Sequence, residues 1–440
     1  MGLSSSLVAL GEGSLPATFD GLRTHLPIEW IRECLKRQGV ATLRKRKLAV
    51  ENVVWLVVGM ALFRNRSITE IVDRLDLVLP GEDGKRQDVA KAAIPPARDR
   101  LGVEPMSELF EMTAQRWAEE SAKRYLWRGL SLFGIDGTTL RTPDSSENRR
   151  CFEKHSDSGY PMLRLTTLLA LRSRIALDCA FDGCRTSETE LAERLLDSIP
   201  DDSLTVMDRY FHNYSIWNAV QAVGKNRHWL VRGRDDLRVW RTIERFAPGD
   251  ELAEIEVSRQ SRSNHPELPK FIHVRVIRYR RPGFKTRTLI TSLLDPKLHP
   301  ADEIVQLYHE RWEIELAYDE LKTQTLESNI ALRSQTPERI RQEVLGLMIA
   351  YNLVRREMAG IADKLKVPAN RISFQATLMM MRDLFYWAEV ATPGKLPAML
   401  AEMRLKLERF VLPERRERHY PRSVKMRPSK YPPRRERQPS

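Results

Sequence analysis

The middle of the chain alternates short apolar runs with helical patterns, which predicts a mixed α/β fold. The runs LFGID and SLTVMD end in Asp136 and Asp208 and predict short buried strands, the first followed by a turn in GTTLRTPD. Two more strand-like runs, LRLTTLLALRS and RIALDCAFDG, lie between the aspartates and precede the helical pattern SETELAERLLDSI. A second helical pattern, RYFHNYSIWNAVQAVG, leads from Asp208 to the apolar run HWLVRG. The predicted order is therefore three strands, a helix, a strand, a helix and a strand.

Helical patterns dominate both ends of the chain. Near the N-terminus, PIEWIRECLKRQG ends at Gly39, AVENVVWLVVGMALF follows, and Ser67 with Glu70 predicts a capping box for SITEIVDRL. The C-terminal helical patterns have broad apolar stripes and include a cluster from Met379 to Met381. Such stripes are usually core, but a methionine cluster also suits a contact between two protomers.

Between Asp208 and Glu315 lie 106 residues, which include a β-rich segment. The runs LAEIEVS, FIHVRVIRYR and TRTLITSLL are rich in alternating β-branched residues, which predicts antiparallel strands. Arginines and aromatic residues are interleaved here, a pattern that suits neutralisation of a nucleic-acid backbone and stacking on an unpaired base. We assign the stacking role to Trp240, because it lies in a polar, arginine-rich stretch. The alternative for Trp240 is a core aromatic at a strand edge.

The segment YHERWEIELAYDELK carries Tyr308, Arg311, Glu315 and Lys322 at helical spacing. On one continuous α-helix these side chains project within an arc of roughly 60°, with Trp312 beside it. An adjacent arc of this helix is apolar and consists of Leu307, Ile314, Ala317 and Leu321. Arg311 and Glu315 also fit an ordinary ion pair on a solvated helix. The two upstream aspartates favour a functional site, since with Glu315 they form a candidate carboxylate triad.

These residues resemble the DDE transposases of the insertion-sequence-four family, whose signature is Tyr-x2-Arg-x3-Glu-x6-Lys. The signature is met at Tyr308, Arg311, Glu315 and Lys322, and GIDGTT and VMDRYF match the two aspartate motifs. The resemblance implies an RNase H-like catalytic core, in agreement with the predicted strand order, and a β-rich insertion. It also implies cut-and-paste DNA transposition, in which a nick at the element end is followed by hairpin formation, hairpin opening and strand transfer.

The chemistry of phosphodiester hydrolysis explains a set of three acids. The reaction needs a nucleophilic water, a stabilised transition state and a neutralised leaving group, and two Mg²⁺ ions about 3.5–4 Å apart provide all three. Because Mg²⁺ prefers hard oxygen ligands, we assign Asp136, Asp208 and Glu315 as catalytic metal ligands, with Mn²⁺ as a substitute metal. Uncompensated carboxylates repel one another, so the metal-free site is predicted to bind ions weakly until DNA phosphate completes it.

The resemblance also implies the partners of the chain. They are double-stranded DNA, as terminal inverted repeats and as target, and a second copy of the chain in a synaptic homodimer. Tyr308, Arg311 and Lys322 are expected at the DNA backbone, with Arg311 able to make a bidentate phosphate contact. For Trp312, packing is expected ahead of base stacking. Further candidate DNA contacts form a basic run near the N-terminus, Arg44, Lys45, Arg46 and Lys47.

Composition is compatible with a nucleic-acid partner. The 440 residues are 42% hydrophobic and carry a net charge of +13, with a pI of about 9.6. The four cysteines lack zinc-site spacing, the apolar runs are too short to span a bilayer, and no Walker-type glycine loop is found. We therefore expect a cytoplasmic, nucleoid-associated bacterial protein with no membrane partner and no nucleotide cofactor.

The predicted organisation has five parts. They are a helical N-terminal DNA-binding domain (1–125), an RNase H-like catalytic core (126–231 and 300–350), a β-rich insertion domain (232–299), a C-terminal helical region with a candidate dimer contact (351–412) and a basic tail predicted to be disordered (413–440). The tail has ten Lys and Arg residues against three Glu.

Two alternative functions stay open. A catalytically silent DNA-binding descendant of a transposase would show no Mg²⁺-dependent cleavage, and a stand-alone RNase H-like nuclease would cut DNA without terminal repeats equally well. A tyrosine recombinase with Tyr308 as nucleophile is disfavoured, because covalent catalysis needs no metal triad.

Overall fold

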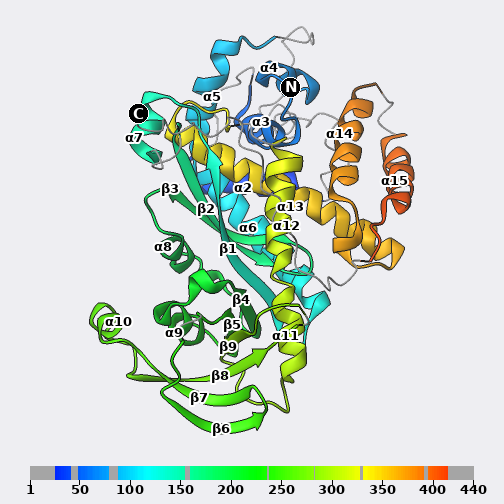
Figure 1. Cartoon of the computed structure of the whole chain (residues 1–440). Helices are drawn as coiled ribbons and strands as arrows, with labels where there is room; N and C mark the ends of the chain where they lie inside the picture. The colour runs from blue at the N-terminus through cyan, green and yellow to red at the C-terminus, as the bar shows by residue number, and fades with distance from the viewer. Residues whose placement is uncertain are drawn as a thin grey trace, which may run out of the picture.

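The computed structural model describes residues 25–40, 48–78, 88–153, 159–234, 237–281, 283–327, 331–390 and 395–414. These residues form a large mixed sheet with helices packed against it (Figure 1). Two predicted features lie outside the described residues: the basic run Arg44, Lys45, Arg46 and Lys47, and residues 415–440 of the basic tail.

The first five strands and two helices confirm the predicted RNase H-like order. In chain order they are β1 (Ser131–Arg141), β2 (Met162–Ala170), β3 (Ile175–Gly183), α8 (Glu188–Glu193), β4 (Ser203–Met207), α9 (Tyr214–Ala222) and β5 (Arg227–Arg232). β1, β2 and β3 are antiparallel neighbours, whereas β4 pairs in parallel with both β1 and β5. Parallel pairing of β1 with β4 matters for function, because it brings two distant segments to the same level of the sheet.

The β-rich segment extends this same sheet. Its strands are β6 (Arg241–Ala247), β7 (Asp250–Glu256), β8 (Phe271–Tyr279) and β9 (Arg287–Thr291). β7, β8 and β9 match the three predicted strands, and β9 joins β5 by antiparallel pairing of Leu230 with Thr291. The strand order is β3-β2-β1-β4-β5-β9-β8-β7-β6. A buried ion pair stabilises the extension, since Arg275 donates to both carboxylate oxygens of Asp250 at 2.7 and 2.6 Å.

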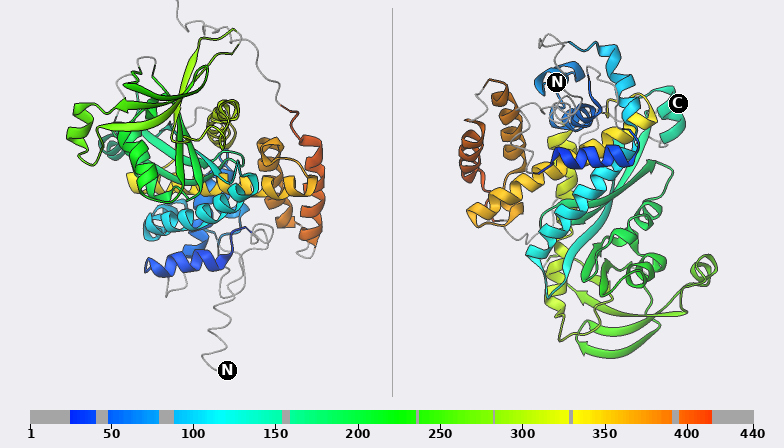
Figure 2. Two further views of the ribbon diagram at one scale, coloured as in Figure 1. Left: turned by 90° about the horizontal axis from the view of Figure 1, so that it is seen from below. Right: turned by 180° about the vertical axis from the view of Figure 1, so that it is seen from behind.

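The N-terminal helices and α13 form layers that pack against the sheet. The N-terminal helices include α2 (Ile28–Arg37), α3 (Val50–Leu62), α4 (Ile68–Arg74) and α6 (Glu104–Ala122), and the capping box of Ser67 and Glu70 is present. The long helix α13 (Pro337–Leu365) packs against α3, α6 and β3. Figure 2 shows α13 and α6 next to the sheet and α2 outside them. A Cβ on Gly346 of α13 would overlap Val57 of α3, so glycine permits this close crossing.

The C-terminal helices lie at one side of the molecule. α14 (Phe374–Val390) packs against the end of α13, and α15 (Leu396–Lys406) packs against α14 (Figure 1). None of the helices in the described part of the chain combines the length and apolarity that crossing a membrane requires.

Candidate active site

Asp136 and Asp208 lie side by side on parallel strands. Ile135 of β1 is the register partner of Met207, the last residue of β4, and each aspartate is the next residue along the chain. Neighbouring strands are about 4.8 Å apart, and residues at the same level project to the same face of a sheet. Asp208 follows the last residue of β4, as predicted, and its carboxylate accepts the main-chain N–H of Tyr210 at 2.6 Å.

Asp136, by contrast, lies within β1 and not at its end. The turn predicted for the residues after Asp136 is wrong over Gly137 to Arg141, because β1 continues and pairs with β2 as far as Arg141 and Met162. β4 pairs with β1 only up to Ile135. Therefore β1 runs past the end of its parallel neighbour at the level of the two aspartates.

The continuous helix predicted around Glu315 is also wrong. The segment consists of α11 (Ala301–His309), α12 (Trp312–Asp319) and the π-helical turn η6 (Glu320–Thr325). Between α11 and α12 the backbone tightens, since the N–H of Glu313 donates to the carbonyl of Glu310 at 2.8 Å. A π turn then widens the helix after α12. The four signature residues consequently do not share one arc: Tyr308 lies on α11, Arg311 precedes α12, Glu315 lies on α12 and Lys322 lies in η6.

α12 packs closely on β1. The predicted apolar arc is confirmed, since its members Leu307, Ile314, Ala317 and Leu321 are all buried. A Cβ on Gly134 would overlap the Ile314 side chain, so the absence of a side chain at Gly134 lets the helix approach the strand. Asp136 is two residues beyond Gly134 and projects to the same face. Packing of Ile314 thus places Glu315, the next residue, near Asp136.

Arg311 links these two acids. Its Nη2 donates to Oε1 of Glu315 at 2.6 Å, and its Nη1 lies 3.5 Å from Oδ2 of Asp136. A guanidinium between two carboxylates offsets their mutual repulsion. Across the residues that the structure describes, no three His, Cys, Asp or Glu side chains are close enough to hold a metal ion. The metal site of Asp136, Asp208 and Glu315 therefore stays a prediction.

The electrostatics of Asp136 suit a cation. The pKa of Asp136 is raised to about 6, mainly by burial and also by the neighbouring carboxylates of Asp208 and Glu315, against the opposing effects of the Gly137 N–H and Arg311. Ionisation of this carboxylate thus costs more free energy than it does in water, and a further positive charge would lower that cost. The donor atoms are hard carboxylate oxygens, which fit Mg²⁺ or Mn²⁺.

A fourth acid, Glu188, was missed by the sequence reasoning. Its carboxylate lies against Gly137 so closely that a Cβ there would collide with it. The pKa of Glu188 is raised to about 7, mainly by burial and also by Asp136 and Asp208, against the opposing effect of Arg164. In the sequence Glu188 appears only as part of a helix start, and the capping box at Ser187 and Glu190 is indeed present.

Tyr318 was missed too. Its hydroxyl donates to the main-chain oxygen of Asp136 at 2.5 Å and lies 2.8 Å from the hydroxyl of Thr167. Burial raises the pKa of Tyr318 well above its usual value. Thr167 is the register partner of Asp136 in β2, a relation that the sequence pattern alone does not reveal.

The predicted DNA-contact residues of the signature differ in exposure. Tyr308 is only 6% exposed, and burial raises its pKa to about 12. Trp312 is 52% exposed, so the expectation that it packs in the core is wrong. Its ring centroid is 6.0 Å from the Arg311 guanidinium. Burial lowers the pKa of Lys322, which has no acidic partner among the described residues.

Trp240 lies away from the carboxylates. It precedes the outermost strand β6, and four strands separate β6 from β4. Its side chain is 61% exposed and rests against Phe271, with ring centroids 5.7 Å apart. The alternative of a core aromatic is therefore wrong, and a stacking role for Trp240 stays a prediction.

Comparison with known proteins identifies the family. Residues 16–111 match the N-terminal region of insertion element 4 transposases, and residues 127–353 match the transposase DDE domain. The transposase InsG for insertion sequence element IS4 of Escherichia coli (strain K12) is 38% identical over 424 residues, which cover 95% of each chain. InsZ of the same strain is 40% identical over 215 residues, or 47% of this chain and 69% of InsZ.

A more distant similarity is found among solved structures. The piggyBac transposase in a synaptic complex with hairpin DNA, determined by cryo-EM, has 10% sequence identity and a TM-score of 0.44, over 91% of this chain and 86% of that one. The two family matches and the relation to InsG along almost the whole chain agree with the signature at Tyr308, Arg311, Glu315 and Lys322. The chain belongs to the IS4 family of DDE transposases, enzymes that cleave and join DNA.

Proposed function

We propose that this transposase excises its element by cut-and-paste transposition through a hairpin intermediate, with Asp136, Asp208 and Glu315 as its catalytic acids. The contacts of Arg311 are the main support for this proposal. A single guanidinium, that of Arg311, contacts both Asp136 and Glu315 at the level of the sheet where Asp208 lies beside Asp136. Three acids that are distant in the sequence thus share one small region.

The three acids would hold two divalent ions, Mg²⁺ or in its place Mn²⁺. When bound, these ions supply an acidified water nucleophile and charge neutralisation at the attacking and leaving oxygens. The chain itself supplies the oxygen ligands and the means to orient them. Asp208 is oriented by the N–H of Tyr210, and Asp136 by the N–H of Gly137 at 2.9 Å. Arg311 holds Glu315 toward Asp136.

Lys322 and Arg311 are proposed to bind the phosphates of the element end. Lys322 lines a pocket of about 270 Å³ together with Arg141 and apolar side chains of β1 and β2. A partly buried ammonium without an acidic partner is incompletely compensated, so an anion should bind there favourably. Arg311 adds a planar guanidinium suited to a phosphate. These two cations lie on either side of Glu315 along the chain.

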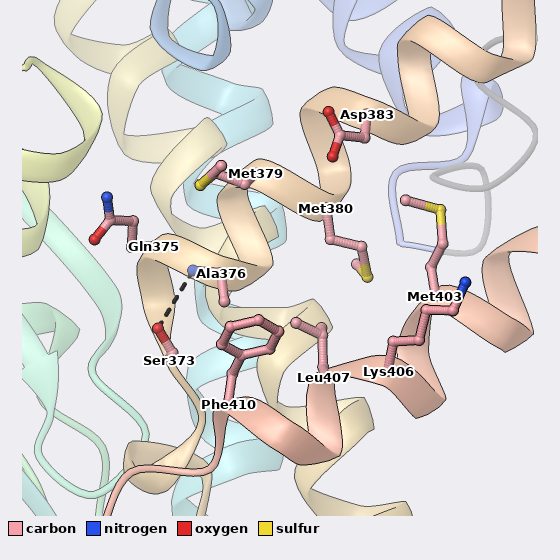
Figure 3. A pocket seen from close by; sticks show the side chains of 10 residues that line it. All are labelled: Ser373, Gln375, Ala376, Met379, Met380, Asp383, Met403, Lys406, Leu407 and Phe410. Atoms are coloured by element: carbon pink, nitrogen blue, oxygen red, sulfur yellow. Dashed lines mark hydrogen bonds between the residues drawn. The ribbon is translucent and has the colours of Figure 1, made fainter.

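The proposal includes a homodimer that joins two element ends. Met379 and Met380 of the predicted methionine cluster line an apolar pocket of about 370 Å³ between α14, α15 and the 3₁₀ turn η9 (Leu407–Phe410) (Figure 3). Met379 and Phe410 at this pocket are 54% and 53% exposed. Exposed methionines adapt to varied apolar partners, and this surface is our candidate for the contact between protomers.

Cleavage of DNA that carries the element end tests the proposed function. In Mg²⁺, the wild type should nick at the end, whereas Asp136→Ala, Asp208→Ala and Glu315→Ala should bind the same DNA with little or no nicking. A protein that binds but never nicks would be a silent descendant. Equal cleavage of DNA without terminal repeats would indicate a stand-alone nuclease. A wild-type level of nicking by any one of the alanine variants would contradict its assignment as a catalytic acid.

A further inference from the structure

The hydroxyl of Tyr318 lies where three elements of the candidate active site meet. It donates a hydrogen bond to the main-chain oxygen of Asp136 at 2.5 Å. Because the hydroxyl proton of Tyr318 takes part in that bond, the hydroxyl of Thr167 is the donor in the 2.8 Å contact and the phenol oxygen of Tyr318 is the acceptor. Thr167 lies directly opposite Asp136 in the β1/β2 register. One oxygen atom therefore joins α12, β1 and β2 at the level of Asp136.

Tyr318 and Glu315 share a face of α12. They are three residues apart, which places them one above the other on the helix surface. Arg311 reaches the same region from the start of α12, so Asp136 has two contacts with this segment. The contact with Arg311 uses the carboxylate, for which a metal ion or a DNA phosphate competes. The contact with Tyr318 uses only the main-chain oxygen and is compatible with a bound metal and DNA.

The opposite side of α12 is held by ion pairs that do not involve Tyr318. Arg174, in the turn between β2 and β3, donates to Glu313 at 2.7 Å and to Glu320 at 2.5 Å. Glu320 also pairs with the buried Arg355 of α13. Loss of the Tyr318 hydroxyl therefore leaves α12 attached to the sheet and to α13. The effect of that loss should be confined to the spacing between the helix and β1 at the site.

We propose that Tyr318 is a positioning residue that fixes the separation of Glu315 from Asp136 during DNA cleavage. This inference rests on the proposed function of the two acids. A tyrosine hydroxyl has a fixed reach from the helix, so its bond to the backbone of β1 sets a distance that flexible acidic side chains cannot set. Residues that orient metal ligands typically change metal affinity or activity by about 10–100-fold when they are altered.

The test compares Tyr318→Phe with wild type in nicking of end-bearing DNA across a Mg²⁺ titration. Phenylalanine keeps the ring and removes both hydrogen bonds. We expect the Mg²⁺ concentration for half-maximal nicking to rise about tenfold or more, while affinity for the DNA without metal stays unchanged. Thr167→Val, which leaves the Tyr318 bond to Asp136 in place, should shift the Mg²⁺ requirement in the same direction by a smaller factor.

Thr166→Val is the matched control for the threonine variant. Thr166 is adjacent to Thr167 and buried, and its hydroxyl has no hydrogen-bond partner in the described part of the chain. This variant should keep the wild-type Mg²⁺ requirement. An unchanged Mg²⁺ requirement in Tyr318→Phe, or a slower rate with lower thermal stability at an unchanged Mg²⁺ requirement, overturns the inference. If Asp136→Ala nicks as well as wild type, the proposed function fails, and the inference fails with it.

Discussion

The segment formed by α12 and η6 carries acidic residues toward two different regions, and the charges are balanced in only one of them. On one side, Glu313 and Glu320 are buried with two arginines, Arg174 and Arg355. On the other side, Glu315 faces Asp136 and Asp208, which also interact with Glu188. Arg311 contacts Glu315 and Asp136, and Arg164 interacts with Glu188. We call these regions the balanced cluster and the acidic cluster.

The two clusters differ in how their carboxylate charges are compensated. This difference distinguishes a structural ion-pair network from a candidate ligand-binding site. In the balanced cluster each acid has a guanidinium partner, so its carboxylate charges are compensated without a ligand, and the cluster joins α12, η6, α13 and the β2–β3 turn. In the acidic cluster Arg311 is shared between Glu315 and Asp136, and the pKa of Asp136 and that of Glu188 are raised. An arrangement that is unfavourable in the free protein and favourable with a bound cation is typical of a functional site.

The largest effect on stability should come from the balanced cluster. Glu320→Ala leaves Arg174 and Arg355 buried with fewer partners, and breaking such a buried pair lowers the free energy of unfolding by about 3–5 kcal/mol. Urea denaturation of the metal-free protein measures this free energy of unfolding. Glu315→Ala, on the same helical segment, is the control and should change stability by no more than about 1 kcal/mol. Equal destabilisation by the two variants would remove the distinction between the clusters.

The variant Asp136→Asn should increase the stability of the metal-free protein, in contrast to Glu320→Ala. The pKa of Asp136 in the folded state is about 6, above its ordinary value of 3.8, so the folded state binds more protons and wild-type stability falls as the pH rises from about 4 to 6. Asparagine does not ionise, so the variant avoids this loss of stability. We expect its free energy of unfolding to exceed that of wild type by about 1–3 kcal/mol at pH 7. The gain should disappear near pH 4. A less stable Asp136→Asn at pH 7 would show that the carboxylate is well compensated in the free protein.

The metal requirement of nicking should depend on pH. Metal ligands bind in their deprotonated form, and the pKa of Asp136 is about 6. Below that pH, the Mg²⁺ concentration for half-maximal nicking should rise by up to about tenfold per pH unit, and above pH 7 it should level off. Titrations of Mg²⁺ at several pH values between 5 and 8 measure this. A requirement that does not vary with pH would argue against Asp136 as a ligand.

Lys322→Met should give the smallest of these effects. Removal of one phosphate contact is expected to weaken binding of the element end by a few-fold and to lower the slope of log affinity against log salt by about 0.9. Binding measured between low and moderate salt gives both quantities. Arg339→Met is a suitable control, because Arg339 already pairs with Asp99 at 2.7 and 2.6 Å. An unchanged salt slope in Lys322→Met would remove Lys322 from the DNA contacts.

The sequence predicted the strand order and the position of Asp208 directly after its strand, because apolar runs and their ends are local features. It failed where the outcome depends on tertiary pairing. β1 continues past Asp136 because β2 pairs with it through Arg141, and the helix around Glu315 is interrupted between His309 and Trp312. Glu188 and Tyr318 were missed for the same reason, since only the packing of α8 and α12 against β1 brings them to Asp136.

We propose that the acidic cluster binds divalent cations once DNA is present. The most direct test of this proposal is electron paramagnetic resonance of Mn²⁺ with the transposase and end-bearing DNA, comparing wild type with Asp136→Asn and with Glu320→Gln. We expect bound Mn²⁺ in wild type and in folded Glu320→Gln, and loss of that bound Mn²⁺ in Asp136→Asn. Equal Mn²⁺ binding by wild type and Asp136→Asn would contradict it.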